Sequence, residues 1–316
     1  RIAGTRARAA WFGAGLLIAH AEDGAVTIFD ITVQQFVNGL ILGSFYTLVA
    51  LGYSMVYGII NLINFAHGDV YMVGAFVGFV FLSLVSGVLG DEWMGITVSM
   101  VLAMISVGFL GVLIQRIAYR PMLSAPRLSI LITAVGVSLV LFNGVMAGTY
   151  GEYTAFNTGL EYEGVTLGHI HITYTQMVMV AATALLMVAL HLFVGRTIYG
   201  KAMRAISIDM DACRLMGIDV NRIIALTFFV GSALAAAAGV MAGVYYGSIH
   251  FFMGFVIGLK AFTAAVIGGI GSIPGAMLGG LVLGLLESFG TQIPWIGTEW
   301  KDVFSFGLLI LILVFK

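Results

Sequence analysis

The sequence predicts an all-α integral membrane protein, a multi-span helical bundle of about 8–10 spans. Three observations support this class. Of the 316 residues, 60% are hydrophobic and only 9% are charged, whereas a soluble domain carries about a quarter charged residues. The mean hydropathy is +1.07. The 42 glycines suit helices that pack closely in lipid, where small side chains let two backbones approach each other.

Apolar stretches of about 20 residues, the length that crosses a bilayer, mark the expected spans. They are 36–60, 70–89, 94–115, 128–149, 173–195 and 223–247. The Gly-rich region 255–290 is long enough for two shorter spans with a turn near 271–275, and a last span begins near Val303. Gly-broken helices and two similar segments, Tyr57–Ile60 and Tyr246–Ile249, suggest an internal inverted repeat, which is common in transporters.

The N-terminal segment has two interpretations. Arg6 and Arg8 precede the apolar run 9–19, and Ala19-His20-Ala21 has the form of a signal-peptide cleavage site. The alternative is a retained, short extra span, which we expect. We therefore divide the chain into an N-terminal extension at 1–30 and a membrane domain at 31–316.

Basic residues gather in alternate loops. Loops 1–8, 116–127 and 196–222 hold 11 of the 14 Lys and Arg residues. Loops 21–30, 90–93 and 150–172 hold acidic residues and no Lys or Arg. Because cytoplasmic loops of membrane proteins are rich in Lys and Arg, the loop 196–222 is expected in the cytoplasm.

The loop 196–222 contains a short amphipathic pattern. Its apolar residues recur at spacings of three and four and are followed by a glycine, which predicts a helix that ends at Gly217. Its residues are Ala205, Ile208, Ala212, Leu215 and Met216 on the apolar side, and Asp209, Asp211 and Arg214 on the polar side. The helix either lies on the membrane surface or is a coupling helix that docks in a groove of a cytoplasmic ATPase.

The segment Gly195–Ala202 nearly matches the phosphate-binding pattern G-x4-G-K-[ST], but Ala202 has no hydroxyl for Mg²⁺ and the segment follows a membrane helix, not a strand. We expect no nucleotide, cofactor or metal on this chain, and any ATP and Mg²⁺ on partner subunits. No span carries paired carboxylates, a metal cluster or a nucleophile with a base, so an enzyme is not expected. A net charge of −1 gives no indication of nucleic-acid binding.

The segment 61–69 joins two spans and holds three polar residues, Asn64, His67 and Asp69. His67 and Asp69 are spaced to form a charged pair. A carboxylate inside the bilayer costs at least about 3 kcal/mol, so Asp69 is expected at the interface or against a partner. We favour a polar hinge in which Asp69 caps the next helix, with a proton relay as the alternative.

A transport path is expected beside the first strong span. Gly43, Tyr46 and Ala50 lie at i, i+3 and i+7, on one face of a helix, and Gly268 lies in the later Gly-rich region. The alternative is that this small face packs against a neighbouring helix. Lys260, the only basic residue between 223 and 300, is expected to extend its ammonium group to the outer surface.

Four segments resemble one family. They are 38–58, 63–69, 205–217 and 259–269, and they look like the permeases of branched-chain amino acid ABC importers of the LivH type. The resemblance runs from about residue 34 to the end, and residues 1–30 depart from it. It implies a bacterial inner-membrane permease that imports branched-chain amino acids.

The resemblance also implies partners: a second related permease, two cytoplasmic ATPases that act on 200–217, and a periplasmic binding protein that delivers Leu, Ile or Val. Whether the two permeases are identical stays open. One alternative is an ABC permease for urea or short amides. Another is an ion-coupled secondary transporter, which needs ionisable residues inside the membrane. The few available, Asp69, Lys260 and Glu287, are expected near span ends.

Overall fold

A computed structural model describes residues 28–60, 64–122, 125–156, 158–159, 163–167, 170–292 and 300–315. The extra span expected before residue 28 lies outside these residues. The described helices are α2 (Ile28–Ile60), α3 (His67–Leu89), α4 (Glu92–Ile114), α5 (Arg127–Thr149), α6 (Tyr174–Arg196), α7 (Ile198–Ile208), α8 (Met210–Leu215), α9 (Val220–Tyr246), α10 (Met253–Gly268), α11 (Ile273–Gly290) and α12 (Lys301–Phe315). Two short turns, η1 (Gln115–Tyr119) and η2 (Arg120–Met122), continue α4.

The all-α, multi-span class is confirmed. Seven helical segments of the described chain are long and apolar enough to cross a membrane, and α10 is a shorter apolar helix of 16 residues. The seven are 28–60, 67–87, 92–122, 128–149, 174–196, 220–246 and 273–290. The first span begins earlier than its apolar run, because side chains such as Thr32 and Gln34 bond within the helix and Gln34 also accepts from the amide of His171.

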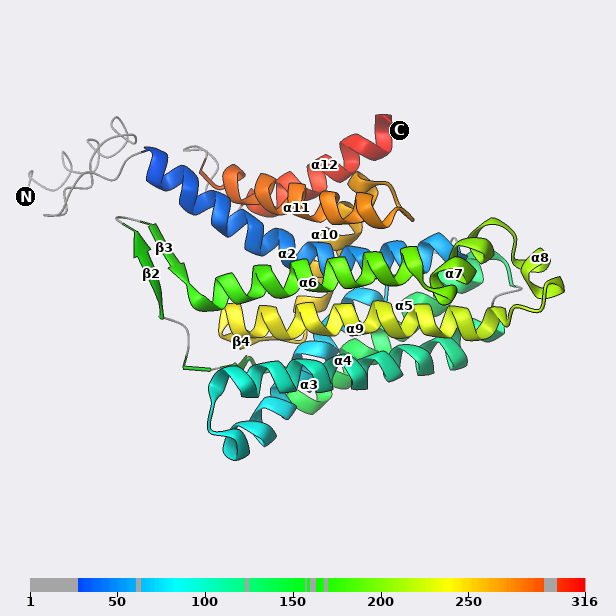
Figure 1. Cartoon of the computed structure of the whole chain (residues 1–316), viewed down its shortest axis with the longest axis horizontal. Coiled ribbons are helices and arrows are strands. Elements are labelled where there is room, and N and C mark those ends of the chain that lie inside the picture. Colours follow the sequence, from blue (N-terminus) through cyan, green and yellow to red (C-terminus); the bar gives the residue numbers. More distant parts are fainter. Residues whose placement is uncertain are drawn as a thin grey trace, which may run out of the picture.

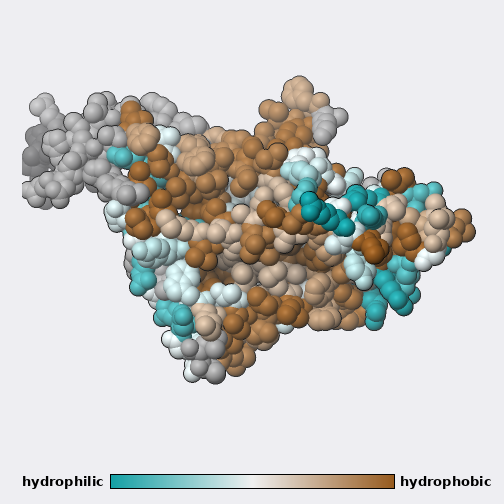
Figure 2. All heavy atoms as spheres, viewed as in Figure 1, coloured by the Kyte–Doolittle hydropathy of each residue, from teal (hydrophilic) through white to brown (hydrophobic). Residues whose placement is uncertain are grey.

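The helices run mainly along the long axis of the molecule, which has two different ends (Figure 1). One end carries α7 and α8. The other carries two small antiparallel pairs, β1 (Thr154–Ala155) with β4 (Ser248–Ile249) and β2 (Gly164–Leu167) with β3 (Ile170–Thr173). Hydrophobic side chains cover the middle of the visible face, and hydrophilic ones gather towards the two ends (Figure 2). This distribution is what a bilayer requires of a protein that crosses it.

The centre of the bundle is formed by α2 and α9. In their most apolar windows, 89% and 78% of residues are buried, against 11% for α5. Small residues make the close contacts: Gly39 and Gly43 of α2 face α11, and a Cβ added at Gly43 would lie 2.9 Å from the Cα of Leu281. A side chain at either glycine would meet the backbone of α11, so glycine at both positions lets α11 pack closely against α2.

The proposed glycine break is present between α10 and α11. Gly269 and Gly271 have φ values of 87° and 91°, which favour glycine, and Ser272 then caps α11 by accepting from the amide of Gly275. The suggested repeat of 57–60 and 246–249 has no common local structure. The first segment is helical to its end, whereas Gly247 ends α9 with a left-handed backbone and Ser248 enters β4.

Candidate functional site

The sequence pattern at 205–216 predicted one helix, and this is wrong. Asp209 has an extended backbone, with φ −150° and ψ 107°, that separates α7 from α8. Its carboxylate accepts hydrogen bonds from the amides of Asp211 and Ala212, both at 2.9 Å. Asp209 therefore acts as the N-cap of α8, and the energy of that cap competes with continuing α7.

The helix α8 ends just before Gly217, as the sequence predicted. Gly217 has a φ of 82°, its amide donates to the carbonyl of Arg214, and the amide of Ile218 donates to the carbonyl of Cys213. This pair of bonds is a Schellman motif, which needs a left-handed residue at the glycine position. At the start of α7, the Thr197 side chain accepts from the amide of Gly200, so both helices of the segment Ile198–Leu215, which we call the α7–α8 hairpin, have defined caps.

One side of the hairpin is held by the bundle and the other is free. Met203, Ile206 and Cys213 are buried, and the Arg204 guanidinium donates to the carbonyl of Val194. The exposed side carries three apolar residues that are 88%, 90% and 82% exposed, and we call them together the α8 patch, although the first of them ends α7. They are Ile208, Leu215 and Met216. Ala205 is half-buried and Ala212 is exposed.

Charged residues border the α8 patch. Arg214 pairs with Asp211 at 2.8 Å, and both side chains are largely exposed. An exposed apolar surface rimmed by polar groups is typical of a protein interaction site. The nearby segment 195–202 crosses from the end of α6 into the first turns of α7, so it forms no glycine-rich loop of the kind that surrounds phosphates.

The polar hinge residues lie inside the bundle. Asn64 accepts from the amide of Ala66 at 3.1 Å and from the hydroxyl of Tyr119 at 2.6 Å. The N-cap of α3 is Ala66, so the expectation that Asp69 caps this helix is wrong. Asp69 lies instead in the first turn of α3 and is only 3% exposed, so its expected place at the interface is also wrong.

The position of α3 explains this difference. A Cβ added at Gly52 of α2 would overlap the His67 ring, and Gly231 of α9 lies against the same ring. The first residue of α3, His67, therefore lies level with Gly52, about two helical turns before the end of α2. The expected His67–Asp69 pair is not among the ion pairs of the described residues; Asp69 accepts from the hydroxyl of Ser138 at 2.5 Å.

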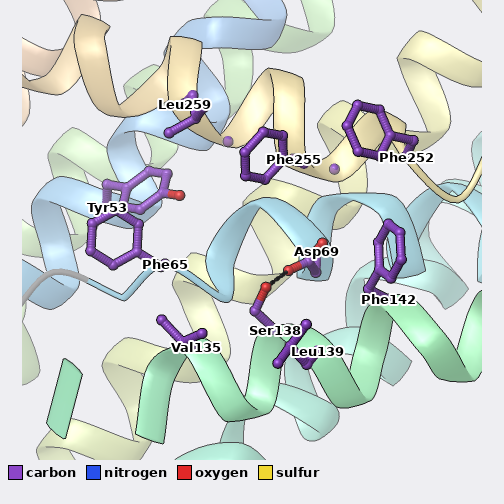
Figure 3. A pocket seen from close by; sticks show the side chains of 12 residues that line it. Tyr53, Phe65, Asp69, Val135, Ser138, Leu139, Phe142, Phe252, Phe255 and Leu259 are labelled. Carbon is purple, nitrogen blue, oxygen red and sulfur yellow. Dashed lines mark hydrogen bonds between the residues drawn. The ribbon is translucent and has the colours of Figure 1, made fainter. Parts of the chain in front are cut away.

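Asp69 opens onto a cavity of about 330 Å³, which we call the Asp69 pocket. Side chains from α2, α5 and α10 and from the segment before α3 complete it, and most are aromatic or aliphatic (Figure 3). Its lining is Tyr53, Phe65, Asp69, Val135, Ser138, Leu139, Phe142, Phe252, Gly254, Phe255, Gly258 and Leu259. Asp69 is the one carboxylate in this described lining.

A second polar site surrounds Lys260, whose expected extension to the surface is wrong. Lys260 is 3% exposed and forms ion pairs with Glu287 of α11 and, at 2.7 Å, with Asp302 of α12. The hydroxyl of Tyr46 donates to Glu287. The carboxylates of α11 and α12 thus pair with the Lys260 ammonium group, and these ion pairs replace the water that would solvate the group at the surface.

We call four residues, Lys260, Glu287, Asp302 and Tyr46, the Lys260 cluster. Together with Tyr246 and other residues, they line a cavity of about 440 Å³. The sequence predicted these ionisable residues near span ends. Asp69 does lie in the first turn of α3 and Glu287 in the last turn of α11, whereas Lys260 lies in the middle of α10, and all three are buried. The rarity of these residues could have identified them as candidate functional residues, because an ionisable residue within an apolar span is uncommon and costly.

The four residues expected along a path have different surroundings. Tyr46 belongs to the Lys260 cluster and lines its cavity. Gly43 packs against α11, and a Cβ added at Gly268 would overlap the backbone of Gly275. Ala50 is fully buried. In this conformation Gly43 and Gly268 pack against neighbouring helices, as the alternative interpretation expected. Of the four residues, only Tyr46 lines a described cavity.

The chain matches one protein family and several characterised relatives. Residues 35–313 match the family described as the permease component of the branched-chain amino acid transport system. The high-affinity branched-chain amino acid permease BraD of Pseudomonas aeruginosa is 46% identical over 90% of this chain and 94% of its own length. LivH of Escherichia coli K12 is 45% identical over 89% and 92%.

A solved structure has a similar fold. It is an ABC transporter assigned to the metal-chelate type, in an inward-facing conformation, and it aligns with a TM-score of 0.52 over 92% of this chain and 87% of its own at 14% identity. These relatives are transporter permeases and not enzymes. From the match along nearly the whole described chain, we conclude that this protein belongs to the permease component family of branched-chain amino acid transport systems.

Proposed function

We propose that this chain is the membrane permease subunit of an ATP-driven importer that carries branched-chain amino acids across the bacterial inner membrane. The observation that carries the proposal is the 46% identity to a branched-chain amino acid permease over 90% of this chain and 94% of the relative. The fold is consistent with it, because seven helices long enough to span a membrane surround buried polar sites.

The partners follow from the same proposal. They are a second permease, two ATPases that bind ATP and Mg²⁺, and a periplasmic protein that delivers the amino acid. The α7–α8 end is the cytoplasmic end, because its loops hold most of the basic residues. The α8 patch is then the surface that an ATPase contacts, and the hairpin is the coupling element.

The hairpin is placed to transmit force. Arg204 and Met203 of α7 line a small cavity with Gly58 of α2 and Gly271 of the α10–α11 turn. A displacement of α8 by an ATPase would therefore reach α2 and the glycine break through direct neighbours. We propose that this movement changes which side of the membrane the path opens to, as the path residues Gly43, Tyr46, Ala50 and Gly268 rearrange.

Substrate and energy source are tested together by transport. Cells that produce the full complex, with and without this chain, are given labelled leucine or labelled urea. We expect leucine uptake that requires both the chain and the ATPases and that persists when ion gradients are collapsed. Urea uptake without leucine uptake would support the short-amide permease instead, and loss of uptake on collapsing the gradients would support the secondary transporter.

Coupling is tested by Ala212→Asp. This residue is exposed next to the α8 patch, so a carboxylate there leaves the fold intact but places a charge in the contact with the ATPase. We expect ATP hydrolysis that no longer responds to substrate and leucine uptake near background. The matched control is Glu152→Ala at the opposite, β-hairpin end, which should transport normally. Normal uptake by Ala212→Asp would refute this role.

A further inference from the structure

The Asp69 pocket contains a carboxylate without a cationic partner. Asp69 is 3% exposed and accepts from Ser138, but among the described residues no Lys, Arg or His forms an ion pair with it. A buried carboxylate in this position either takes up a proton or receives a cation from outside the chain.

The pocket also offers a partner for a negative group. Gly254 and Phe255, in the first turn of α10, form part of its lining. His250 accepts from the amides of Phe252 and Met253, and no described side chain accepts from the amides of Gly254 and Phe255. The N-terminal amides of a helix attract carboxylates. The first turns of α3 and α10 lie against each other, since a Cβ added at Gly254 would lie 3.0 Å from the Cα of Asp69. A carboxylate and the amide end of a helix are therefore side by side.

The rest of the pocket is suited to an aliphatic group. Val135, Leu139 and Phe142 of α5 form one wall, and the rings of Phe252 and Phe255 lie along the side formed by the start of α10 (Figure 3). Aromatic faces also attract an ammonium group when it is close. The volume of about 330 Å³ is at the lower end of the range of small-molecule pockets, about 300–1,000 Å³.

We propose that the Asp69 pocket is an intramembrane binding site for the transported amino acid. Asp69 accepts hydrogen bonds from the α-ammonium group, the first turn of α10 faces the α-carboxylate, and the aliphatic side chain lies against Val135, Leu139 and the phenyl rings. The inference rests on the proposed function, because it names the site that this cargo occupies. A neutral amide such as urea would leave the carboxylate without a counter-charge.

The test measures occupancy directly. The full complex is reconstituted in nanodiscs with Cys213→Ser and a reporter cysteine, Leu139→Cys, and the rate of maleimide labelling is followed. Three ligands are compared: leucine, 4-methylpentanoate, which lacks the ammonium group, and 3-methylbutylamine, which lacks the carboxylate. We expect leucine to slow labelling about tenfold at a concentration where 4-methylpentanoate has no effect, the difference that a charge-assisted hydrogen bond gives. The amine should protect partially.

A matched control uses another apolar cavity. Ala184→Cys lies in the cavity between α2, α6 and α11, which is about 380 Å³ and has no carboxylate in its described lining, so leucine should not change its labelling. Val135→Cys is a second reporter in the Asp69 pocket. In the Asp69→Asn background, the labelling rate without ligand should stay the same and the protection by leucine should be lost.

The outcomes separate the two proposals. Equal protection by leucine and 4-methylpentanoate would show an apolar occupant, such as a lipid chain, and would overturn the inference; so would protection that survives Asp69→Asn. If the unmodified complex imports leucine but neither reporter is protected, the inference fails while the proposed function stands. If the unmodified complex does not import leucine, the proposed function itself fails.

Discussion

Two buried carboxylates of this protein have opposite environments. Glu287 accepts a hydrogen bond from the hydroxyl of Tyr46 and forms an ion pair with Lys260, which also forms one with Asp302. Among the described residues, Asp69 accepts a side-chain hydrogen bond from Ser138 alone, and it faces an apolar cavity. The first carboxylate is compensated within the chain, so its interactions join α2, α10, α11 and α12. The second is left open to a ligand.

The two environments fit two different roles, a structural one for the Lys260 cluster and the proposed binding role for Asp69. A compensated charge that loses its partner destabilises the fold, because the remaining charge stays buried. An uncompensated charge that is neutralised should change binding much more than stability.

Lys260→Met should give the largest effect. The change keeps the length and apolar stem of the side chain but leaves Glu287 and Asp302 without a counter-charge. Breaking a buried pair in this way costs about 3–5 kcal/mol. We expect a strongly lowered midpoint of thermal unfolding for the purified complex in detergent. The double variant with Glu287→Gln should recover part of the loss, and a midpoint equal to that of the unmodified protein would contradict a structural role for the cluster.

Asp69→Asn should reduce transport and leave the fold stable. The amide has the same size as the carboxylate and still accepts from Ser138, so we expect less than about 1 kcal/mol of lost stability. Leucine uptake at low substrate concentration should fall about tenfold, as one lost charge-assisted hydrogen bond predicts. Ser138→Ala is the control that removes the neighbouring hydroxyl but keeps the charge. A loss of stability as large as that of Lys260→Met would erase the distinction between the two sites.

Tyr46→Phe should give the smallest effect. The hydroxyl donates to Glu287, but Lys260 still compensates that carboxylate after the change. Removal of one hydrogen bond costs about 1 kcal/mol. We expect a slightly lowered unfolding midpoint in the same assay. If Tyr46→Phe instead abolishes leucine uptake without affecting stability, then the Lys260 cavity, and not the Asp69 pocket, is where the cargo contacts the chain.

Much of the fold could be read from the sequence because membrane spans are a local property. An apolar run of sufficient length crosses the bilayer whatever its neighbours are, and the spans at 70–89, 128–149 and 223–247 correspond to α3, α5 and α9. The glycine that ends α8 was also predictable, since a left-handed C′ position has a strong residue preference. The break at Asp209 was not, because an aspartate pattern fits a helix face and a helix cap equally well.

The candidate sites depended on which helices face each other. Sequence reasoning identified Asn64, His67 and Asp69 as a hinge but placed Asp69 at the interface, and it placed Lys260 at the surface. The Lys260 error arose because the sequence does not show that Glu287 and Asp302 lie beside its amine. The Asp69 error has another cause. The sequence gives the distance of a residue from the ends of its own span, but not the depth at which that span begins in the bundle. The start of α3 beside Gly52, and not level with the end of α2, decides the burial of Asp69.

The amino-acid pattern alone identifies a helical membrane protein and locates most of its spans, and its basic loops predict which end of the bundle is cytoplasmic. Those properties depend on the transfer of local segments from water to lipid. Only the tertiary structure decided that Lys260 meets Glu287 and Asp302, that Asp69 meets Ser138 and a cavity, and that Gly43 packs against α11. These pairings join residues far apart in the chain, and the close approach of helix backbones that brings them together is a property of the whole bundle.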